Sequence, residues 1–156
     1  MKGATAAALL LAGAGFVSAS LAAAAQNAVP VYKPGLADLM TMTVQPRHIK
    51  LALAGREKNW VYAKYEVTEL GDALARAAAL WPKYKGLPID GMVDAFAKGP
   101  MAQLSAAIDG KDPNKFTAAY GQLSAGCNAC HQVANVGHVV IKTPDMSSFP
   151  DQDFRP

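Results

Sequence analysis

The residues with the clearest chemical potential are Cys127, Cys130 and His131, which form the pattern C-x-x-C-H. This spacing is the attachment signal for a c-type haem. Each thiol can form a thioether bond with one vinyl group of the porphyrin, and the adjacent imidazole can bind the iron from the proximal side. On a helix these residues stand at i, i+3 and i+4, so all three lie on one face. The motif therefore predicts one covalently bound haem c, with His131 as an iron ligand.

Three other uses of the cysteine pair are weaker. The chain has no further cysteine, so a structural zinc site would lack its second pair of thiolate ligands. A redox-active C-x-x-C is expected near a βαβ pattern, which this sequence does not show. A disulfide across a two-residue gap would constrain little of the unfolded chain. Zinc binding and redox chemistry remain the alternatives to haem attachment.

Residues 1–25 are predicted to be a cleaved secretory signal peptide. Lys2 gives a positive start, residues 6–17 are apolar, and residues 19–25 offer small-residue cleavage sites of the A-x-A type. The alternative is a membrane anchor, but the apolar run is short and no stop-transfer charge cluster follows it. Export to the periplasm of a Gram-negative bacterium agrees with the haem motif and leaves no membrane span in the mature chain.

The mature chain, residues 26–156, has the size of a single domain. Removal of Lys2 leaves 14 basic and 12 acidic residues, a net charge of +2. A charge so close to zero gives no indication of nucleic acid or of a strongly charged membrane surface as a partner. No pair of acids and no nucleophile beside a base is legible, so the chain is not predicted to be an enzyme.

The mature chain has the pattern of an all-α fold. Apolar residues recur every three or four positions, as on the buried face of a helix. Such repeats occupy residues 35–54, 59–81, 89–109 and 112–136. Pro46 should kink or locally open the first segment. Gly99-Pro100 interrupts the third, which is either two short helices or one kinked helix. Antiparallel helices joined by short loops form a four-helix bundle whose core can enclose a cofactor, and the haem motif lies on the apolar stripe of the last helix.

Polar and small residues mark the predicted helix boundaries. Asn59 and Asp112 are candidate N-caps of the second and fourth helices. Gly55 and Gly137 are predicted to end the first and fourth. Glu66 lies off the apolar stripe of the second helix, so we expect it to be solvated or paired at the rim. The segment between the second and third helices is predicted to be a loop.

Residues 138–156 are predicted to form an extended tail, because prolines at positions 144, 150 and 156 exclude another long helix. Two interpretations remain open. Val140, Ile141 and Phe149 could pin the tail over the bundle or the haem edge, or the tail could be a frayed terminus.

An attachment motif on the last helix, near the C-terminus, resembles the cytochrome c prime family of class II c-type cytochromes. The resemblance covers residues 35–136, and its specific part is the C-x-x-C-H motif. The segment Gln45–Leu51 and the ending 140–154 look like a less studied branch of such proteins, and the tail is a departure from the family. The resemblance implies an antiparallel four-helix bundle with haem near the C-terminal helix. It also implies one-electron transfer between periplasmic donor and acceptor proteins, and homodimers, which are common in the family.

In the resembled family, a residue about three turns into the first helix covers the sixth position of the iron. Three turns from Gly35 reach Arg47 or His48. His48 is the candidate sixth ligand and would give a bis-histidine, low-spin haem; Met42 and Met40 are the alternatives. Each has a plainer interpretation, since Met42 fits the apolar stripe as a core residue and His48 could be a surface or propionate-binding residue. An open site would give a five-coordinate haem that binds a diatomic gas such as NO or CO.

Overall fold

The computed structural model describes residues 32–156, so the predicted signal peptide, residues 1–25, lies outside the described residues. Residues 33–156 form one unit and are mostly helical, which confirms the predicted all-α class. No helix in residues 32–156 has both the length and the apolar character needed to cross a membrane.

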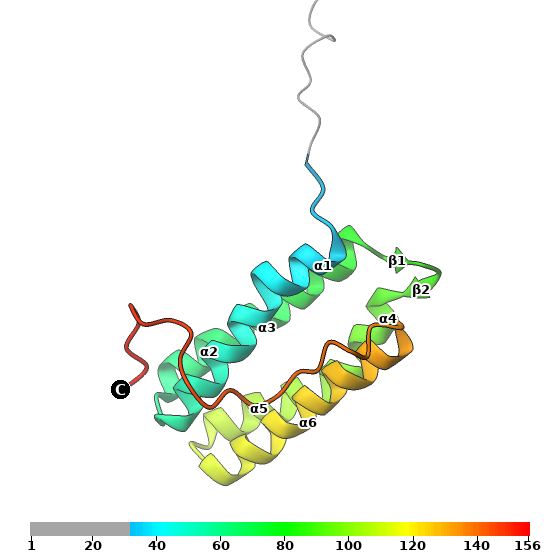
Figure 1. Ribbon diagram of the computed structural model, residues 1–156. Coiled ribbons are helices and arrows are strands. Elements are labelled where there is room, and N and C mark those ends of the chain that lie inside the picture. The colour runs from blue at the N-terminus through cyan, green and yellow to red at the C-terminus, as the bar shows by residue number, and fades with distance from the viewer. Residues whose placement is uncertain (1–31) are drawn as a thin grey trace, which may run out of the picture. The chain divides into compact units, whose positions relative to one another are not determined.

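The helices form four continuous runs in this part of the chain (Figure 1). The elements are α1 (Leu36–Leu39), the π-helical turn η1 (Met40–Val44), α2 (Gln45–Arg56), α3 (Trp60–Leu80), β1 (Lys83–Tyr84), β2 (Leu87–Pro88), α4 (Ile89–Val93), the π-helical turn η2 (Asp94–Lys98), α5 (Gly99–Asp109) and α6 (Pro113–Val133). The first run consists of α1, η1 and α2, and the third of α4, η2 and α5. The first run packs mainly on α3, and α5 packs mainly on α6.

Both π-helical turns end two residues before a proline. Pro46 and Pro100 have no N–H, and their rings crowd the preceding turn. The turn widens to accommodate each ring, and the amide of Gln45 accordingly bonds to the carbonyl of Met40, five residues back. The predicted kinks at the two prolines are thus local widenings within continuous helical runs.

The widened turn changes which residues of the first run face the core. Val44 is buried and Met40 is partly buried against the core, whereas the side chain of Met42 is 74% exposed. The prediction that Met42 belongs to the apolar stripe was therefore wrong. A regular 3.6-residue period does not hold across a π-helical turn, so the apolar stripe passes through Met40 and Val44 instead of Met42.

The core lies between the four runs. All four runs contribute to its largest fully buried apolar side chains, which are Leu51, Leu53, Leu70, Leu104 and Leu123. Burial of each such side chain contributes about 1.5–3 kcal/mol. Hydrophobic packing of the helices is thus the main stabilising term that positions α6 and its motif.

The predicted N-caps are confirmed, as is the predicted end of the third helix at Gly110, but the predicted stops at Gly55 and Gly137 are not. The Asn59 side chain accepts a bond from the amide of Tyr62 at 3.1 Å, and Asp112 caps α6 by accepting two backbone amides. Gly55 lies inside α2, where a Cβ would overlap the ring of Phe116, so its role is close packing. The chain instead turns at Lys58 after α2. After α6 it turns at Asn135, which has a left-handed backbone conformation (φ 57°) and precedes Gly137.

The predicted loop between α3 and α4 contains a minimal hairpin. Lys83 pairs with Pro88 and Tyr84 with Leu87 in an antiparallel register. The two residues between the strands both have positive φ, 50° and 85°, and the second of them is Gly86. This is the backbone that a two-residue hairpin turn requires.

The C-terminal tail is held along the helices. In Figure 1 it leaves the end of α6 and runs back beside α6 toward the end of α2. Phe154 is only 6% exposed and stacks on Tyr62 at 5.5 Å between ring centroids. Phe149 and Ile141 are partly buried, but Val140 is 71% exposed. The pinned interpretation is therefore confirmed, except that Val140 takes no part and Phe154, which the pattern did not single out, is the main anchor.

Replacement of Gly126 by alanine should separate α6 from η2. A Cβ at Gly126 would overlap the carbonyl oxygen of Phe96, and a backbone group cannot move aside as a flexible side chain can. We expect Gly126→Ala to lower the free energy of unfolding by about 1–3 kcal/mol, as overpacking does. Urea denaturation measures the loss. The control is Gly121→Ala on the same helix, whose Cβ would meet nothing within 4 Å and which should stabilise the helix by about 0.5–1 kcal/mol. Equal stabilities of the two variants would contradict the close approach.

Candidate functional site

The C-x-x-C-H motif occupies the last two turns of α6. The helix begins at Pro113, whose fixed φ suits the first helical position, and it places Cys127, Cys130 and His131 on adjacent positions of one face. Both cysteines are free and about half-buried. Burial raises the pKa of Cys127 to about 11, with a further contribution from Cys130, and burial also raises the pKa of Cys130. Redox-active cysteines need a lowered pKa, so this environment disfavours the redox alternative.

Among residues 32–156, one ring nitrogen of His131 has a hydrogen-bond partner and the other has none. Its Nδ1 lies 2.6 Å from the carbonyl oxygen of Val139, in the tail. A carbonyl only accepts, so Nδ1 must carry the proton and donate it. The lone pair is then on Nε2, the nitrogen that a neutral imidazole presents to a metal. The structure thus holds His131 in the tautomer that an iron ligand requires.

This donor set fits a covalently bound haem better than it fits a chelated ion. Within residues 32–156 no group of three or more His, Cys, Asp or Glu side chains is placed to hold a metal ion. Thioether attachment does not need such a group, because the sulfurs bond to porphyrin carbons and only the imidazole binds iron. Two thiols and a free Nε2 at i, i+3 and i+4 are the groups that a haem c would use.

His48 lies on α2 and packs against α6, N-terminal to the motif. It is 5% exposed, and its Nδ1 lies 2.8 Å from the hydroxyl of Tyr120. Its Nε2 lies 3.0 Å from the hydroxyl of Ser124, seven residues before His131. Burial lowers the pKa of His48 to about 4, so the ring is neutral at physiological pH. His48 is therefore a buried imidazole with a partner at each ring nitrogen, and the interpretation of His48 as a surface residue was wrong.

The two methionine candidates lie in η1, before His48. Met42 projects into solvent, and Met40 packs against the core. The three candidates for the sixth position therefore differ in environment: one buried imidazole, one partly buried thioether and one exposed thioether.

A buried ion pair that the sequence did not predict lies beside His48. Glu66 on α3 has a fully buried side chain, and Arg47 Nη1 lies 3.3 Å from each of its carboxylate oxygens. Arg47 Nη2 also lies 3.3 Å from Glu69. Burial raises the pKa of Glu66, and the charge of Arg47 opposes that shift. The expectation that Glu66 is solvated or at the rim was wrong, because α2 packs over it and supplies the partner.

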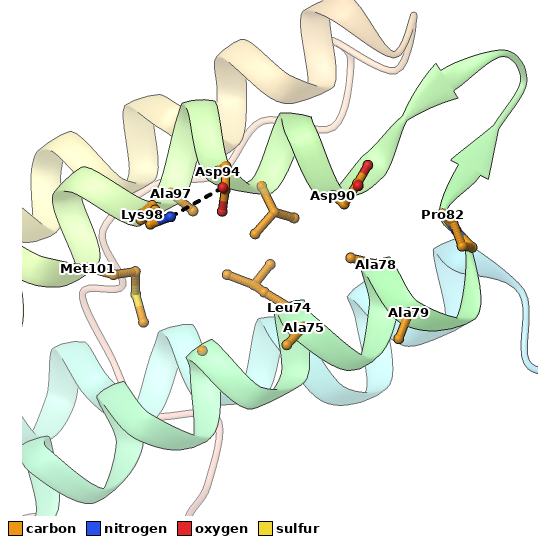
Figure 2. Close-up of a pocket in the computed structure, with 12 residues that line it drawn as sticks. Leu74, Ala75, Ala78, Ala79, Pro82, Asp90, Asp94, Ala97, Lys98 and Met101 are labelled. Atoms are coloured by element: carbon orange, nitrogen blue, oxygen red, sulfur yellow. Dashed lines mark hydrogen bonds and ion pairs between the residues drawn. The ribbon is translucent and has the colours of Figure 1, made fainter.

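An open apolar groove of about 630 Å³ lies between α3 and the third run. Figure 2 shows Leu74 and Ala78 of α3 facing side chains of the opposite run, with the ion pair of Asp94 and Lys98 at the rim. Cys127, Cys130 and His131 are not among its lining residues. The groove therefore gives no support to haem binding.

Comparison of the chain with protein-family models, with curated proteins and with solved structures finds no match.

Proposed function

We propose that this protein is a periplasmic, monohaem c-type cytochrome that carries one electron between redox proteins and is not itself an enzyme. The observation that carries the proposal is the state of His131: it directly follows a C-x-x-C pair, and the bond to Val139 leaves Nε2 free. The haem would supply the electron exchange. The chain would supply Cys127 and Cys130 as attachment points, His131 as proximal ligand, and helices that shield the ring from water.

The helical arrangement supports a place near the cytochrome c prime family. The motif lies on the last run, the first run packs on α3, α5 packs on α6, and α3 also packs on α5. These pairings support an antiparallel four-helix bundle, and we propose that the haem lies near its C-terminal helix. We extend the proposal to periplasmic donor and acceptor proteins as partners and to a homodimer. The signal peptide predicted over residues 1–25 supports the proposal of export.

The sixth iron position determines how the haem would act, and we propose His48 as the ligand. It is the one candidate that is both buried and neutral, with a nitrogen lone pair as its donor. Ligation by Nε2 requires it to leave Ser124, at a net cost of about 1 kcal/mol for one hydrogen bond. A six-coordinate, low-spin iron changes little on reduction, which suits electron transfer.

A second candidate function is gas binding at a five-coordinate iron, and the hydrogen bonds of His48 favour it. Both ring nitrogens of His48 are held, by Tyr120 and Ser124, and Met42 faces solvent. If His48 keeps these bonds when haem is attached, the sixth position stays open to NO or CO.

The proposal is tested by mass and colour. Protein purified from the periplasm should carry the mass of one haem beyond the processed polypeptide and a c-type absorption spectrum. The double variant Cys127→Ser/Cys130→Ser should lose all covalently bound haem, because both thioether bonds are removed. The matched control is Ala129→Ser, which adds a hydroxyl to the same turn of α6 and keeps both thiols. A colourless parent protein with both thiols titratable would overturn the proposal.

A further inference from the structure

We propose that the C-terminal tail positions the proximal ligand: the Val139 carbonyl fixes the tautomer and orientation of His131, and Asn128 holds that carbonyl in place. The inference rests on the proposed function, since it assigns a role to tail residues at the same site. It names Asn128 as a positioning residue that would not touch the haem.

Asn128 makes a two-point contact with the tail. Its Nδ2 donates to the carbonyl of Ile141 at 2.8 Å, and its Oδ1 accepts the amide of Ile141 at 2.7 Å. The carboxamide thus satisfies both backbone groups of Ile141, as a neighbouring strand would. A side chain that uses its donor and its acceptor on one residue fixes the position of that residue along the helix, because a shift of one residue would break both bonds.

The order of these contacts is that of two backbones running in opposite directions, since Ile141 meets Asn128 and Val139 meets His131. Asn128 and His131 are three residues apart, a rise of about 4.5 Å on a helix. Val139 and Ile141 are two residues apart, about 6.6 Å in an extended chain. A tail that is bound to Asn128 at Ile141 therefore brings the Val139 carbonyl to the height of His131, where it accepts the Nδ1 proton.

The segment is also held on both sides of this contact. Toward the helix, the amide of Val136 bonds to the His131 carbonyl at 2.9 Å, and the amide of Val139 bonds to the Val136 carbonyl at 2.9 Å. Farther along, Arg56 donates to the Asp145 carbonyl at 3.1 Å. The tail is consequently a strap that is attached before and after the Val139 carbonyl. Thermal opening at one end of the strap therefore does not release that carbonyl.

The physical consequence concerns the strength of His131 as a ligand. A metal-bound histidine whose other nitrogen donates to a carbonyl is held in orientation and is more basic. A more basic ligand stabilises the ferric state more than the ferrous state, so the strap should lower the reduction potential. Loss of an outer partner of a bound histidine changes metal affinity by roughly 10–100-fold.

The test compares Asn128→Ala with the parent haem protein. Alanine is a good helix former, so α6 should persist, as far-UV circular dichroism checks. We expect the equilibrium constant for reduction to rise by up to about tenfold, about 59 mV for one electron. Nuclear magnetic resonance of the ferrous protein should show faster solvent exchange of the His131 Nδ1 proton. Gln122→Ala, an exposed amide on the same helix, should change neither quantity.

A second variant acts from the tail and leaves α6 unchanged. Ile141→Pro removes the amide that Asn128 accepts, and it should shift the potential and the proton exchange in the same direction. If the parent carries haem and both variants keep the parent potential and exchange rate, the strap has no positioning role and only this inference fails. If the parent carries no haem, the proposed function fails, and the inference falls with it.

Discussion

Replacing Arg47 with methionine should cost about 3–5 kcal/mol of folding free energy, the typical penalty for leaving a buried charge without its partner. Methionine keeps most of the aliphatic bulk, so the loss reports the charge rather than a cavity. The Glu66 side chain is fully buried, and Arg47 bonds to both of its carboxylate oxygens. Without Arg47, either the ionised carboxylate remains buried and unpaired or Glu66 takes up a proton.

The loss should depend on pH in a defined direction. Burial raises the pKa of Glu66 in the folded protein, and Arg47 opposes that shift, so removal of Arg47 raises it further. A carboxyl group with a higher pKa in the folded than in the unfolded state binds more protons when folded, and stability then falls as pH rises between the two values. The deficit of Arg47→Met should therefore be smallest below the ordinary glutamate range and full above the raised pKa. Urea denaturation at about pH 3.5, below the ordinary glutamate pKa, and at about pH 8 measures the deficit at the two limits.

The matched control is Lys64→Met, which removes an exposed ion pair between Lys64 of α3 and Asp109 of α5. Exposed pairs contribute at most about 1 kcal/mol, so this variant should be nearly neutral. The double variant Arg47→Met/Glu66→Leu should recover much of the loss, because it removes both buried charges. If Arg47→Met and Lys64→Met lowered the free energy of unfolding equally, or if the loss in Arg47→Met did not change with pH, the buried pair would be contradicted.

Sequence periodicity predicted the helices but not their local departures. The apolar repeats and the caps at Asn59 and Asp112 depend on neighbours within one or two turns, so they can be read from the chain. The change of register at η1 cannot, because a period of 3.6 assumes a regular helix. The proline indicates that the helix is distorted, but not how. Met42 consequently seemed a core residue, although its side chain lies in solvent.

Contacts between distant segments set the other limit. Glu66 stands off the stripe of its own helix, and only the packing of α2 over α3 shows that Arg47 buries it. The bond from His131 to Val139 likewise needs the return path of the tail, which prolines alone cannot predict. The C-x-x-C-H motif was legible because its three reactive groups lie within one turn of one helix. The haem itself stays a prediction.

Replacing His48 with leucine should convert a low-spin haem to a high-spin one, if His48 is the sixth ligand. The pKa of His48 is lowered to about 4 by burial, so its imidazole is neutral and able to bind iron at physiological pH. The variant should still fold, because the remaining hydroxyl groups keep partners. In the variant, the Tyr120 hydroxyl can donate to the backbone carbonyl at position 48, 2.8 Å away, and the Ser124 hydroxyl can donate to the carbonyl of Tyr120, 3.1 Å away.

The measurement is the visible spectrum of ferric and ferrous protein, with carbon monoxide added to the ferrous form. The parent should show low-spin bands that the gas leaves unchanged, and His48→Leu should show a high-spin spectrum that shifts with the gas. Met42→Leu is the control, since an exposed side chain cannot cover a buried iron, and Met40→Leu tests the other thioether. Conversion by Met40→Leu alone would make that methionine the ligand. A parent that is already high-spin and binds the gas would show that Tyr120 and Ser124 keep the imidazole, and gas binding would then replace electron transfer as the proposed function.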